Sequence, residues 1–244
     1  MTFYATTIIY GFTVKRGPLK RIGLFGGTFN PIHRGHLQVI QEVLEAFSLD
    51  QIKLIPAALP PHKESGGVAD AQDRLQMIRL AVANYPALMQ SVAVSDVELK
   101  RPGPSYTIDT VRYFMQVLPE NNGLFFILGM DAFHEIDTWK SYLDLFELVP
   151  FIVMARPGVY RHDGDLKWKI LEKYLKSKIS DAYRFSASRS CYVHAEKQPI
   201  FVFDVTPVEI SSSQIRELVK DRRSITSLVP EKVEDFIKTK GLYL

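Results

Sequence analysis

The chain has 244 residues, of which 30 are Lys or Arg, 27 are Asp or Glu and one is Cys. This length predicts one or at most two globular domains, and a composition of 46% hydrophobic and 23% charged residues excludes wholesale disorder. The single cysteine excludes an internal disulfide framework and a cysteine-based zinc cluster, and it fits a reducing compartment. The net charge of +3 is too small to indicate a nucleic acid partner.

The first twenty residues contain a short, broken apolar stretch whose basic residues follow it, which is the reverse of the charge order in a signal peptide. The chain also lacks a run of about 18 apolar residues, the length that a membrane span requires. We interpret residues 1–20 as an N-terminal extension of unknown role. We expect a cytoplasmic protein that binds neither nucleic acid nor membrane.

The positive charge is unevenly distributed along the chain. Residues 160–198 hold nine Lys and Arg against five Asp and Glu, a local charge of +4 that leaves −1 for the rest. The basic balance therefore belongs to this one segment.

The apolar pattern predicts an alternation of strands and helices. In chain order these are a strand at 22–25, a helix at 37–47, a strand at 52–55, a helix at 70–85, a strand at 91–99, a helix at 107–118, strands at 123–128 and 149–155, a helix at 166–175, a strand at 199–205, and helices at 211–219 and 231–240. Such an order predicts an α/β fold with a doubly wound, mostly parallel sheet and a C-terminal helical portion. We expect residues 21–244 to form a single domain.

The loop after the first strand reads GGTFNPIHRGH, residues 26–36. In open parallel sheets, ligands bind at the carboxyl ends of the strands. Gly26 and Gly27 allow close approach of a ligand, and the following helix start offers N–H groups to an anion. His33 and His36 are three residues apart, so in a first helical turn both rings can face one phosphate and stabilise charge on it. A metal site or two ordinary surface histidines are the alternatives.

The loop before the penultimate helix reads ISSSQIR, residues 210–216. One serine is explained by helix capping alone. Three hydroxyls together with Arg216 exceed what a cap needs, and they suit the binding of a pyrophosphate group.

These two loops resemble the signature motifs of the nucleotidyltransferase superfamily, the T/H-x-G-H adenylyltransferases and cytidylyltransferases. The resemblance implies that His33 and His36 bind the phosphates of ATP and stabilise the transition state, and that Arg216 joins them in catalysis. The other residues that it assigns to ATP in these loops are Gly26, Gly27, Thr28, Phe29, Ser212 and Ser213.

Three further segments, with Trp139, narrow the resemblance: PPHK at 60–63, RPGPSYTIDT at 101–110 and GMD at 129–131. Together they resemble the bacterial nicotinate (nicotinamide) mononucleotide adenylyltransferase family, with its Rossmann-like fold. The similarity runs from about residue 21 to the end and is weakest at 160–198. It implies that the mononucleotide is bound by Lys63, Tyr106, Thr107 and Trp139, and that Asp131 and Arg156 contact the ATP moiety.

Several of these residues have a simpler explanation. Thr107 could cap the helix that it begins, Asp131 could be a helix N-cap, and Trp139 could be an ordinary core residue. His62 could only pack or cap. The residues that match no motif, and that we interpret as structural or surface residues, are His134, His162, His194 and Cys191.

The resemblance implies adenylyl transfer from ATP to nicotinate mononucleotide, which gives nicotinate adenine dinucleotide and pyrophosphate in NAD biosynthesis. Mg²⁺ is expected to arrive with the ATP phosphates rather than in a metal site of the protein. An adenylyltransferase of the phosphopantetheine type and a catalytically silent nucleotide-binding homologue are the alternatives. The sequence does not decide between nicotinate and nicotinamide mononucleotide, and homo-oligomerisation stays open.

Overall fold

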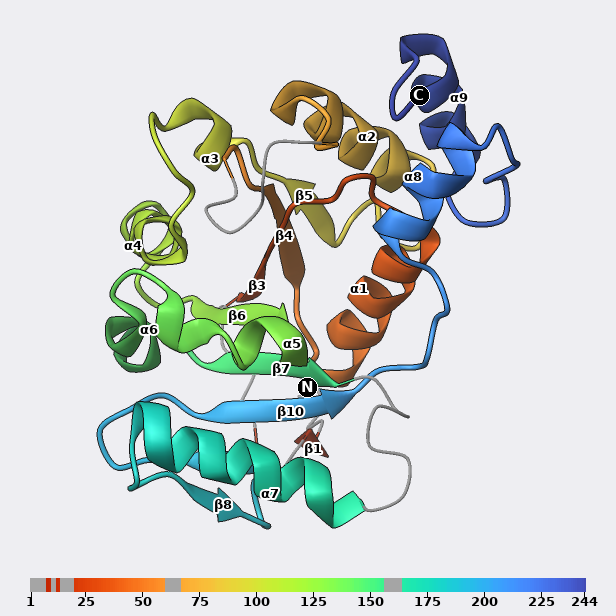
Figure 1. The fold of residues 1–244 in the computed structure, drawn as a ribbon. Coiled ribbons are helices and arrows are strands. Elements are labelled where there is room, and N and C mark those ends of the chain that lie inside the picture. The colour runs from red at the N-terminus through yellow and green to blue at the C-terminus, as the bar shows by residue number, and fades with distance from the viewer. Residues whose placement is uncertain (1–7, 10–11, 14–19, 60–66, 156–163) are drawn as a thin grey trace, which may run out of the picture. The chain divides into compact units, whose positions relative to one another are not determined.

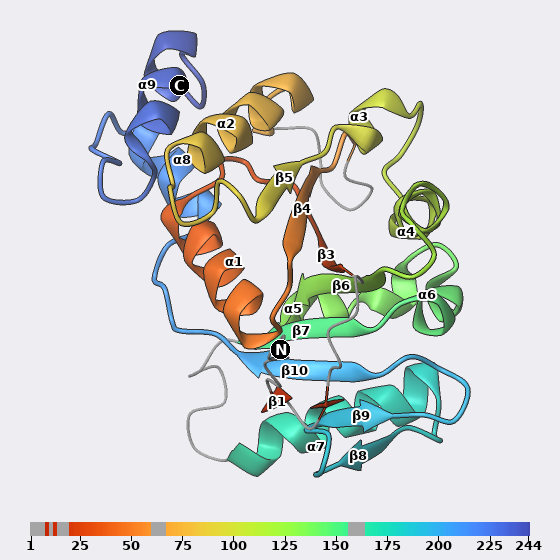
Figure 2. The same ribbon diagram turned by 180° about the vertical axis from the view of Figure 1, so that it is seen from behind.

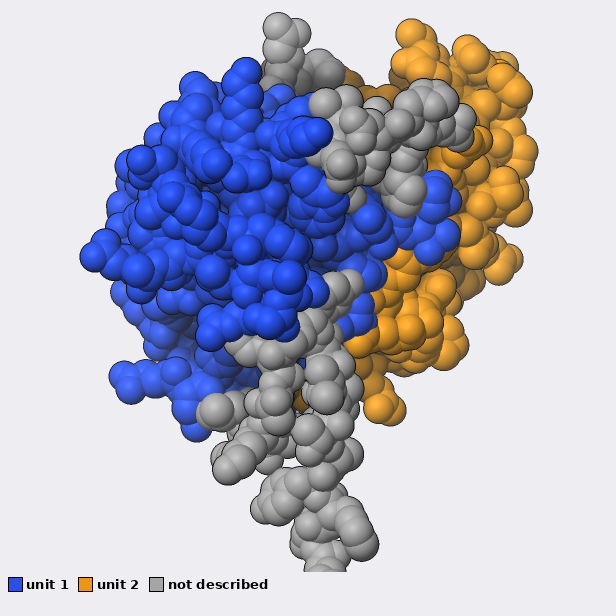
Figure 3. Space-filling view, turned by 90° about the horizontal axis from the view of Figure 1, so that it is seen from below, with its two compact units in different colours: residues 1–24, 46–49, 106–207 blue, residues 25–45, 50–105, 208–244 orange. Residues whose placement is uncertain are grey.

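The computed structural model describes residues 8–9, 12–13, 20–59, 67–155 and 164–244. The chain divides into two compact units, which Figure 3 colours separately. Unit 1 comprises Met1–Leu24, Ala46–Leu49 and Tyr106–Pro207, and unit 2 comprises Phe25–Glu45, Asp50–Ser105 and Val208–Leu244. We describe each unit by itself; the prediction of a single domain over 21–244 stays a prediction.

Unit 2 contains both the GGTFNPIHRGH loop and the ISSSQIR motif. Its strands are the end of β3 (Arg21–Gly27), β4 (Gln51–Pro56) and β5 (Val92–Val94), in the order β5-β4-β3. Its helices are α1 (Arg34–Ala46), α2 (Ala71–Ala83), α3 (Val97–Lys100), α8 (Ser212–Lys220) and α9 (Glu231–Lys240) (Figure 1). β4 and β5 pair in parallel, with Ile52 opposite Val92. The apolar stripe predicted for the first helix is buried in α1, at Leu37, Ile40, Val43 and Leu44.

The prediction of a strand over residues 91–99 is wrong in its second half. β5 ends at Val94, and α3 begins at Val97 after Asp96 in the N-cap position. The alternating apolar pattern continues through α3, but a Ser-Asp pair is typical of helix starts. The Lys100 ammonium also lies 3.0 Å from the Asp96 carboxylate one helical turn away. The Ser95 hydroxyl accepts the Val97 N–H at 3.4 Å, whereas the Asp96 side chain makes no cap hydrogen bond, so these local contacts rather than a full cap favour the helical turn over the alternating pattern.

Unit 1 carries most of the sheet. The start of β3, β6 (Gly123–Gly129), β7 (Phe151–Ala155), β10 (Ile200–Asp204), β9 (Cys191–Val193) and β8 (Arg184–Ser186) follow one another in that order. β6–β7 and β7–β10 are parallel pairs, whereas β10–β9 and β9–β8 are antiparallel. All five residues of β7 are buried, as expected for an inner parallel strand. A separate antiparallel pair joins β1 (Ile8–Ile9) and β2 (Phe12–Thr13).

The helical elements of unit 1 are α4 (Thr107–Val117), α5 (Met130–Phe133), the 3₁₀-helix η1 (Ile136–Thr138), α6 (Tyr142–Leu148), α7 (Gly164–Tyr174) and the π-helix η2 (Leu175–Ile179). α7 lies along β8 and β9 in both views (Figures 1 and 2). The Trp168 ring makes this contact, with ring centroids 5.8 Å from Phe185 and 6.4 Å from Tyr192. The basic segment thus supplies an antiparallel hairpin and the helix that covers it.

The fold is the doubly wound, mostly parallel α/β class that the sequence predicts, and α8 and α9 form the C-terminal helical portion. Among the helices in the described ranges, none combines the length and the apolar character that crossing a bilayer would need.

Candidate active site

The turn after β3 is shaped by Gly27 and Phe29. A Cβ on Gly27 would lie 3.0 Å from the Phe29 ring, so a larger residue at position 27 would displace that ring. Phe29 has a φ of 48° and is 3% exposed, and its ring meets the His36 ring edge-on with centroids 5.3 Å apart. The Phe29 ring therefore packs against the His36 ring. A Cβ on Gly26 would instead lie in open space.

His33 and His36 lie together at the start of α1. The His33 carbonyl accepts the backbone N–H of His36 at 2.9 Å, so the two residues share the first helical turn. Their ring centroids are 3.7 Å apart, and His33 is 6% exposed. Neither α1 nor α8 has an acidic residue in its first turn, which leaves the positive end of each helix dipole without a competing carboxylate there. The two rings thus occupy one side of an anion-favouring helix start.

Gly35 and a backbone contact fix the histidine geometry. A Cβ on Gly35 would lie 3.1 Å from His33 Nδ1 and 3.2 Å from Val208 Cγ1, so glycine leaves room for the His33 ring. The His33 N–H donates to His36 Nδ1 at 3.2 Å. Because Nδ1 accepts, the proton of the neutral His36 ring lies on Nε2. His36 can then act as a donor through Nε2.

The three serines of the ISSSQIR motif have three different roles. The Ser211 hydroxyl accepts the Gln214 N–H at 3.1 Å and caps α8. The Ser212 hydroxyl donates to the Pro31 carbonyl at 2.9 Å. The Ser213 hydroxyl accepts from Arg216 Nη2 at 3.2 Å. Capping thus explains Ser211 alone, and the other two serines belong to contacts with the first loop and with the arginine.

Arg216 joins the last motif to the first. Its Nη1 donates to the Asn30 carbonyl at 2.9 Å, while Nη2 contacts the Ser213 hydroxyl. Together with the Ser212–Pro31 bond, this places the ISSSQIR motif directly against the GGTFNPIHRGH loop. The two motifs form one constellation in unit 2, although Arg216 and Asn30 are 186 residues apart in the sequence.

Sequence reasoning missed Asn30, Arg74 and Tyr243. Asn30 is 4% exposed; its Nδ2 donates to the Gly67 carbonyl at 2.9 Å, and its Oδ1 accepts from Tyr243 Oη at 2.8 Å. The asparagine stands inside the predicted loop, but nothing in the local pattern distinguishes it. For Tyr243 the sequence offers no signal.

Arg74 is a buried cation beneath this loop. It is 1% exposed, and its guanidinium donates to the carbonyls of Ala69, Thr28 and Ala58 at 2.9, 2.8 and 3.2 Å. Burial lowers the pKa of Arg74, but an arginine remains charged in a protein. The three carbonyls satisfy this charge and tie the glycine turn to the segments after β4 and before α2. An arginine within the buried stripe of α2 is a signal that could have found it.

The start of α4 lies in unit 1. Tyr106 occupies its N-cap position without a side-chain cap, and Thr107 is the first helical residue. The alternative that Thr107 caps the helix is therefore wrong. Lys140 Nζ lies 4.6 Å from the centroid of the Tyr106 ring and 3.2 Å from Asp109 Oδ2. Lys140 thus links this helix start to the segment that carries the neighbouring tryptophan.

Trp139 and Asp131 follow β6. Trp139 is partly exposed and meets Phe126 edge-on, with centroids 6.2 Å apart, so one part of the indole packs and another remains accessible. Asp131 is exposed and is the second residue of α5, whose N-cap position is Gly129. The explanation of Trp139 as an ordinary core residue is therefore incomplete. The explanation of Asp131 as a helix N-cap is wrong.

Four residues of the sequence-based interpretation fall outside the described residues: His62, Lys63, Arg156 and His162.

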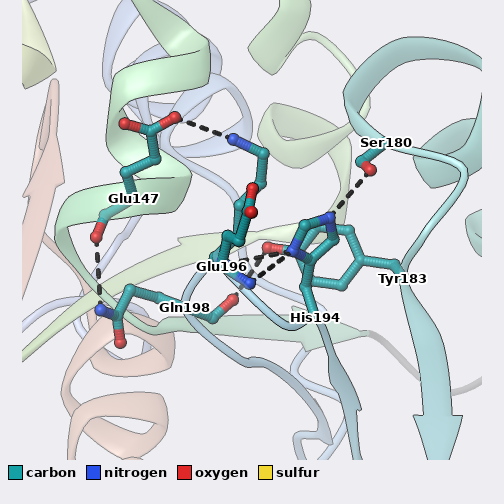
Figure 4. A network of polar contacts seen from close by, with 7 residues as sticks. Glu147, Ser180, Tyr183, His194, Glu196 and Gln198 are labelled. Atoms are coloured by element: carbon teal, nitrogen blue, oxygen red, sulfur yellow. Dashed lines mark hydrogen bonds and ion pairs between the residues drawn. The ribbon is translucent and has the colours of Figure 1, made fainter.

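His194 is a structural residue (Figure 4). Its Nδ1 accepts the N–H groups of Glu196 and Lys197 at 3.0 and 3.1 Å, so the ring proton lies on Nε2, 3.0 Å from the Ser180 hydroxyl. A histidine held in this tautomer cannot act as a base toward Ser180. Burial raises the pKa of Cys191 to about 11, so its thiol is not an activated nucleophile.

Three lysines of the basic segment form ion pairs within unit 1. Lys178 Nζ lies 2.9 Å from Asp137, and Lys197 Nζ lies 3.0 Å from Glu147. Lys176 pairs with Glu172 at 2.6 Å. Two of these pairs join the segment to residues outside it, Asp137 in η1 and Glu147 in α6, and the third joins α7 to η2.

Comparisons with known proteins show the family of this chain. Residues 24–218 match the family model described as cytidylyltransferase-like. A Desulfatibacillum aliphaticivorans protein described as a probable nicotinate-nucleotide adenylyltransferase is 43% identical over 227 residues, 92% of this chain and 100% of that protein. A Geotalea daltonii (strain DSM 22248 / JCM 15807 / FRC-32) protein with the same description is 37% identical over 91% of this chain and 98% of its own length.

A solved structure shares the fold. The Plasmodium falciparum nicotinic acid mononucleotide adenylyltransferase complexed with NaAD aligns over 92% of this chain and 97% of its own, with a TM-score of 0.68. Its sequence identity is 19%, so this likeness concerns the fold.

Proposed function

The chain belongs to the cytidylyltransferase-like nucleotidyltransferases and, among them, to the nicotinate-nucleotide adenylyltransferases, and from this premise we propose how its residues carry out the reaction. It transfers the adenylyl group of ATP to nicotinate mononucleotide in NAD biosynthesis. An oxygen of the mononucleotide 5′-phosphate attacks the α-phosphorus of ATP, and the bond from that phosphorus to the bridging oxygen breaks. Nicotinate adenine dinucleotide forms and pyrophosphate leaves.

One observation carries the assignment of the ATP site. The histidine loop and the ISSSQIR motif meet through the Arg216–Asn30 and Ser212–Pro31 hydrogen bonds, both 2.9 Å long. This contact gathers two helix starts, two imidazoles and one guanidinium in unit 2. Such a set of donors and positive charge suits a polyphosphate.

His33 and His36 stabilise the charge that develops on the phosphate oxygens. The nucleophile is already an anion, so no side chain has to remove a proton. Catalysis then consists of holding two polyanions in line and neutralising their charge. The His36 Nε2 proton, fixed by the 3.2 Å contact at Nδ1, is the donor that we assign to a phosphate oxygen. Arg216 adds a fixed charge to the leaving pyrophosphate.

The residues that we assign to the rest of ATP are Gly26, Gly27, Thr28, Phe29, Asp131, Arg156, Ser212 and Ser213. The packing of Phe29 against His36 supports an indirect role for this side chain. The exposed carboxylate of Asp131 suits hydrogen bonds from ribose hydroxyls.

We assign Tyr106, Thr107, Trp139 and Lys63 to the mononucleotide. The N–H groups at the start of α4 suit the nicotinate carboxylate, because the positive end of a helix dipole favours an anion and the first-turn carboxylate of Asp109 is paired with Lys140. The accessible part of the Trp139 indole suits a cationic pyridine ring. The first of these features favours the acid over the amide, whereas the pyridine ring is cationic in both mononucleotides.

Mg²⁺ enters as part of the MgATP substrate. Within the described ranges, no group of three His, Cys, Asp or Glu side chains comes together as a metal site would require. The location in the cytoplasm and the lack of a nucleic acid or membrane partner stay predictions.

The His36→Ala variant tests this function through pyrophosphate release from ATP and nicotinate mononucleotide. We expect kcat to fall about 100- to 1,000-fold, the usual cost of removing one transition-state donor. Gln41→Ala is the matched control, because Gln41 lies on the same helix and its side chain contacts Glu45 and the Tyr85 hydroxyl. Near-normal pyrophosphate release by His36→Ala would refute the role of this residue. An inactive wild-type chain that still binds ATP would favour the silent homologue instead.

The ratio of kcat/KM for nicotinate and nicotinamide mononucleotides tests the substrate preference. We expect the acid to be preferred, because an amide cannot offer a negative charge to the start of α4. Equal values would contradict the assignment of Thr107.

A further inference from the structure

The segment after α9 turns back toward unit 2. Gly241 has a φ of 63° in the left-handed region, and the Leu242 N–H donates to the Ile237 carbonyl at 3.0 Å. Tyr243 follows with a φ of 69°, which is uncommon for a residue that carries a side chain. A conformation of this kind persists where surrounding contacts hold it.

The Tyr243 hydroxyl forms a hydrogen bond with the Asn30 side chain. It donates to Asn30 Oδ1 at 2.8 Å, and the same oxygen accepts the Ala69 N–H at 3.0 Å. Asn30 Nδ2 donates to the Gly67 carbonyl at 2.9 Å. The amide oxygen therefore uses both of its acceptor positions, and three bonds fix the Asn30 side chain.

The backbone of the same asparagine receives Arg216. Its carbonyl accepts Arg216 Nη1 at 2.9 Å, and the next carbonyl, that of Pro31, accepts the Ser212 hydroxyl at 2.9 Å. A shift of Asn30 would therefore move the guanidinium assigned to the phosphates. Burial raises the pKa of Tyr243 against the opposing charges of Arg216 and Arg74, so the hydroxyl remains a donor.

We propose that Tyr243 is a positioning residue for the ATP site, which holds Asn30 in place and so sets where Arg216 presents its guanidinium. The inference rests on the proposed function, because it assumes that Arg216 meets the phosphates of ATP. It adds to the site a residue that lies 213 positions from its hydrogen-bond partner. Tyr243 acts through Asn30 and is not a catalytic residue.

The Tyr243→Phe variant tests the proposal, because it removes the hydroxyl and keeps the ring. We expect KM for ATP to rise about two- to tenfold, the range that follows from the loss of one hydrogen bond. KM for the mononucleotide should stay near the wild-type value, and the unfolding temperature should fall by only a few degrees. In an Asn30→Ala background, Tyr243→Phe should change nothing further. An unchanged KM for ATP would overturn the proposal, and so would an equal rise of both KM values together with a lower unfolding temperature.

Tyr113→Phe is the matched control. Tyr113 lies on α4 with 41% of its surface exposed, and its substitution should leave both KM values unchanged. Equilibrium binding of ATP separates this proposal from the proposed function. If the wild-type chain binds ATP without turnover and Tyr243→Phe binds it more weakly, the positioning role stands and the function fails. If turnover occurs and ATP binding is unaltered in Tyr243→Phe, only the positioning role fails. A chain that binds no ATP overturns both.

Discussion

Replacing Arg74 by methionine tests how the glycine turn is held. Arg74 is 1% exposed and donates to the carbonyls of Thr28, Ala58 and Ala69 over 2.8–3.2 Å. Methionine keeps an apolar stem but no donor, so each carbonyl loses this bond. A buried acceptor left without its donor costs about 1–3 kcal/mol, and relief of the buried cation recovers part of the sum. We expect the free energy of unfolding to fall by about 3–5 kcal/mol.

Urea unfolding followed by circular dichroism measures this loss. In a chain of this size, it corresponds to a fall of about 6–20 °C in the unfolding temperature. Arg79→Met is the matched control, because Arg79 lies on the same helix with its side chain 51% exposed and 3.9 Å from Asp96. A surface pair of this kind contributes about 0–1 kcal/mol. If Arg74→Met is within about 1 kcal/mol of Arg79→Met, the three carbonyl bonds do not carry the stability assigned to them.

Lysine at position 74 refines the measurement. It keeps the positive charge but replaces a planar fork of five donors with a single ammonium group. Arg74→Lys should therefore lie between the wild type and Arg74→Met in its free energy of unfolding. A value equal to that of Arg74→Met would show that the geometry of the fork, rather than the charge, supplies the whole effect.

The pKa of Asp137 lies below its ordinary value, and the hydrogen bond from Lys178 is the largest cause. The Asp137 carboxylate therefore stabilises the fold above the unfolded-state pKa of about 3.9. This stabilisation is lost as the pH falls through the lower folded-state pKa. Asp137→Asn should thus be less stable at neutral pH and lose less stability on acidification, as urea titrations across pH would detect. Ser211→Ala should cost about 0.5–2 kcal/mol of unfolding free energy, because the cap of α8 is lost; no change in urea titration would contradict this. Trp139→Ala should raise KM for the mononucleotide more than Trp139→Phe does, and equal effects in steady-state assays would argue against stacking. Cys191, with a pKa raised to about 11 by burial, should react with a maleimide only under denaturing conditions; rapid labelling of the folded chain would contradict its burial.

Local patterns predicted most of the fold. The continuous apolar run of β6 and the one-sided stripe of α1 each follow from the periodicity of their own residues. The same reasoning missed β8 and β9, whose three residues each are too short to show a pattern. Their pairing depends on contact with β10 and on the ring of Trp168, which come from elsewhere in the chain.

The chemistry-bearing motifs were also readable in the sequence. His33, His36 and the serines before Arg216 occur as short patterns at helix starts, where spacing alone determines which groups can share a ligand. The sequence did not predict which serine plays which role. That Ser211 caps the helix while Ser212 bonds a carbonyl depends on the backbone position of Pro31, which the local pattern does not contain.

The small net charge of +3 indicated no partner, and by itself it gave no hint of an anion site. The sequence alone predicted the fold class, the pairing of the two histidines and the second motif that we assign to phosphate, because each depends on residues within a few positions of one another. Only the tertiary structure decided that Asn30 receives both Arg216 and Tyr243, across 186 and 213 positions. Hydrogen bonds over such separations depend on the folded path of the chain, and no local pattern of residues records that path.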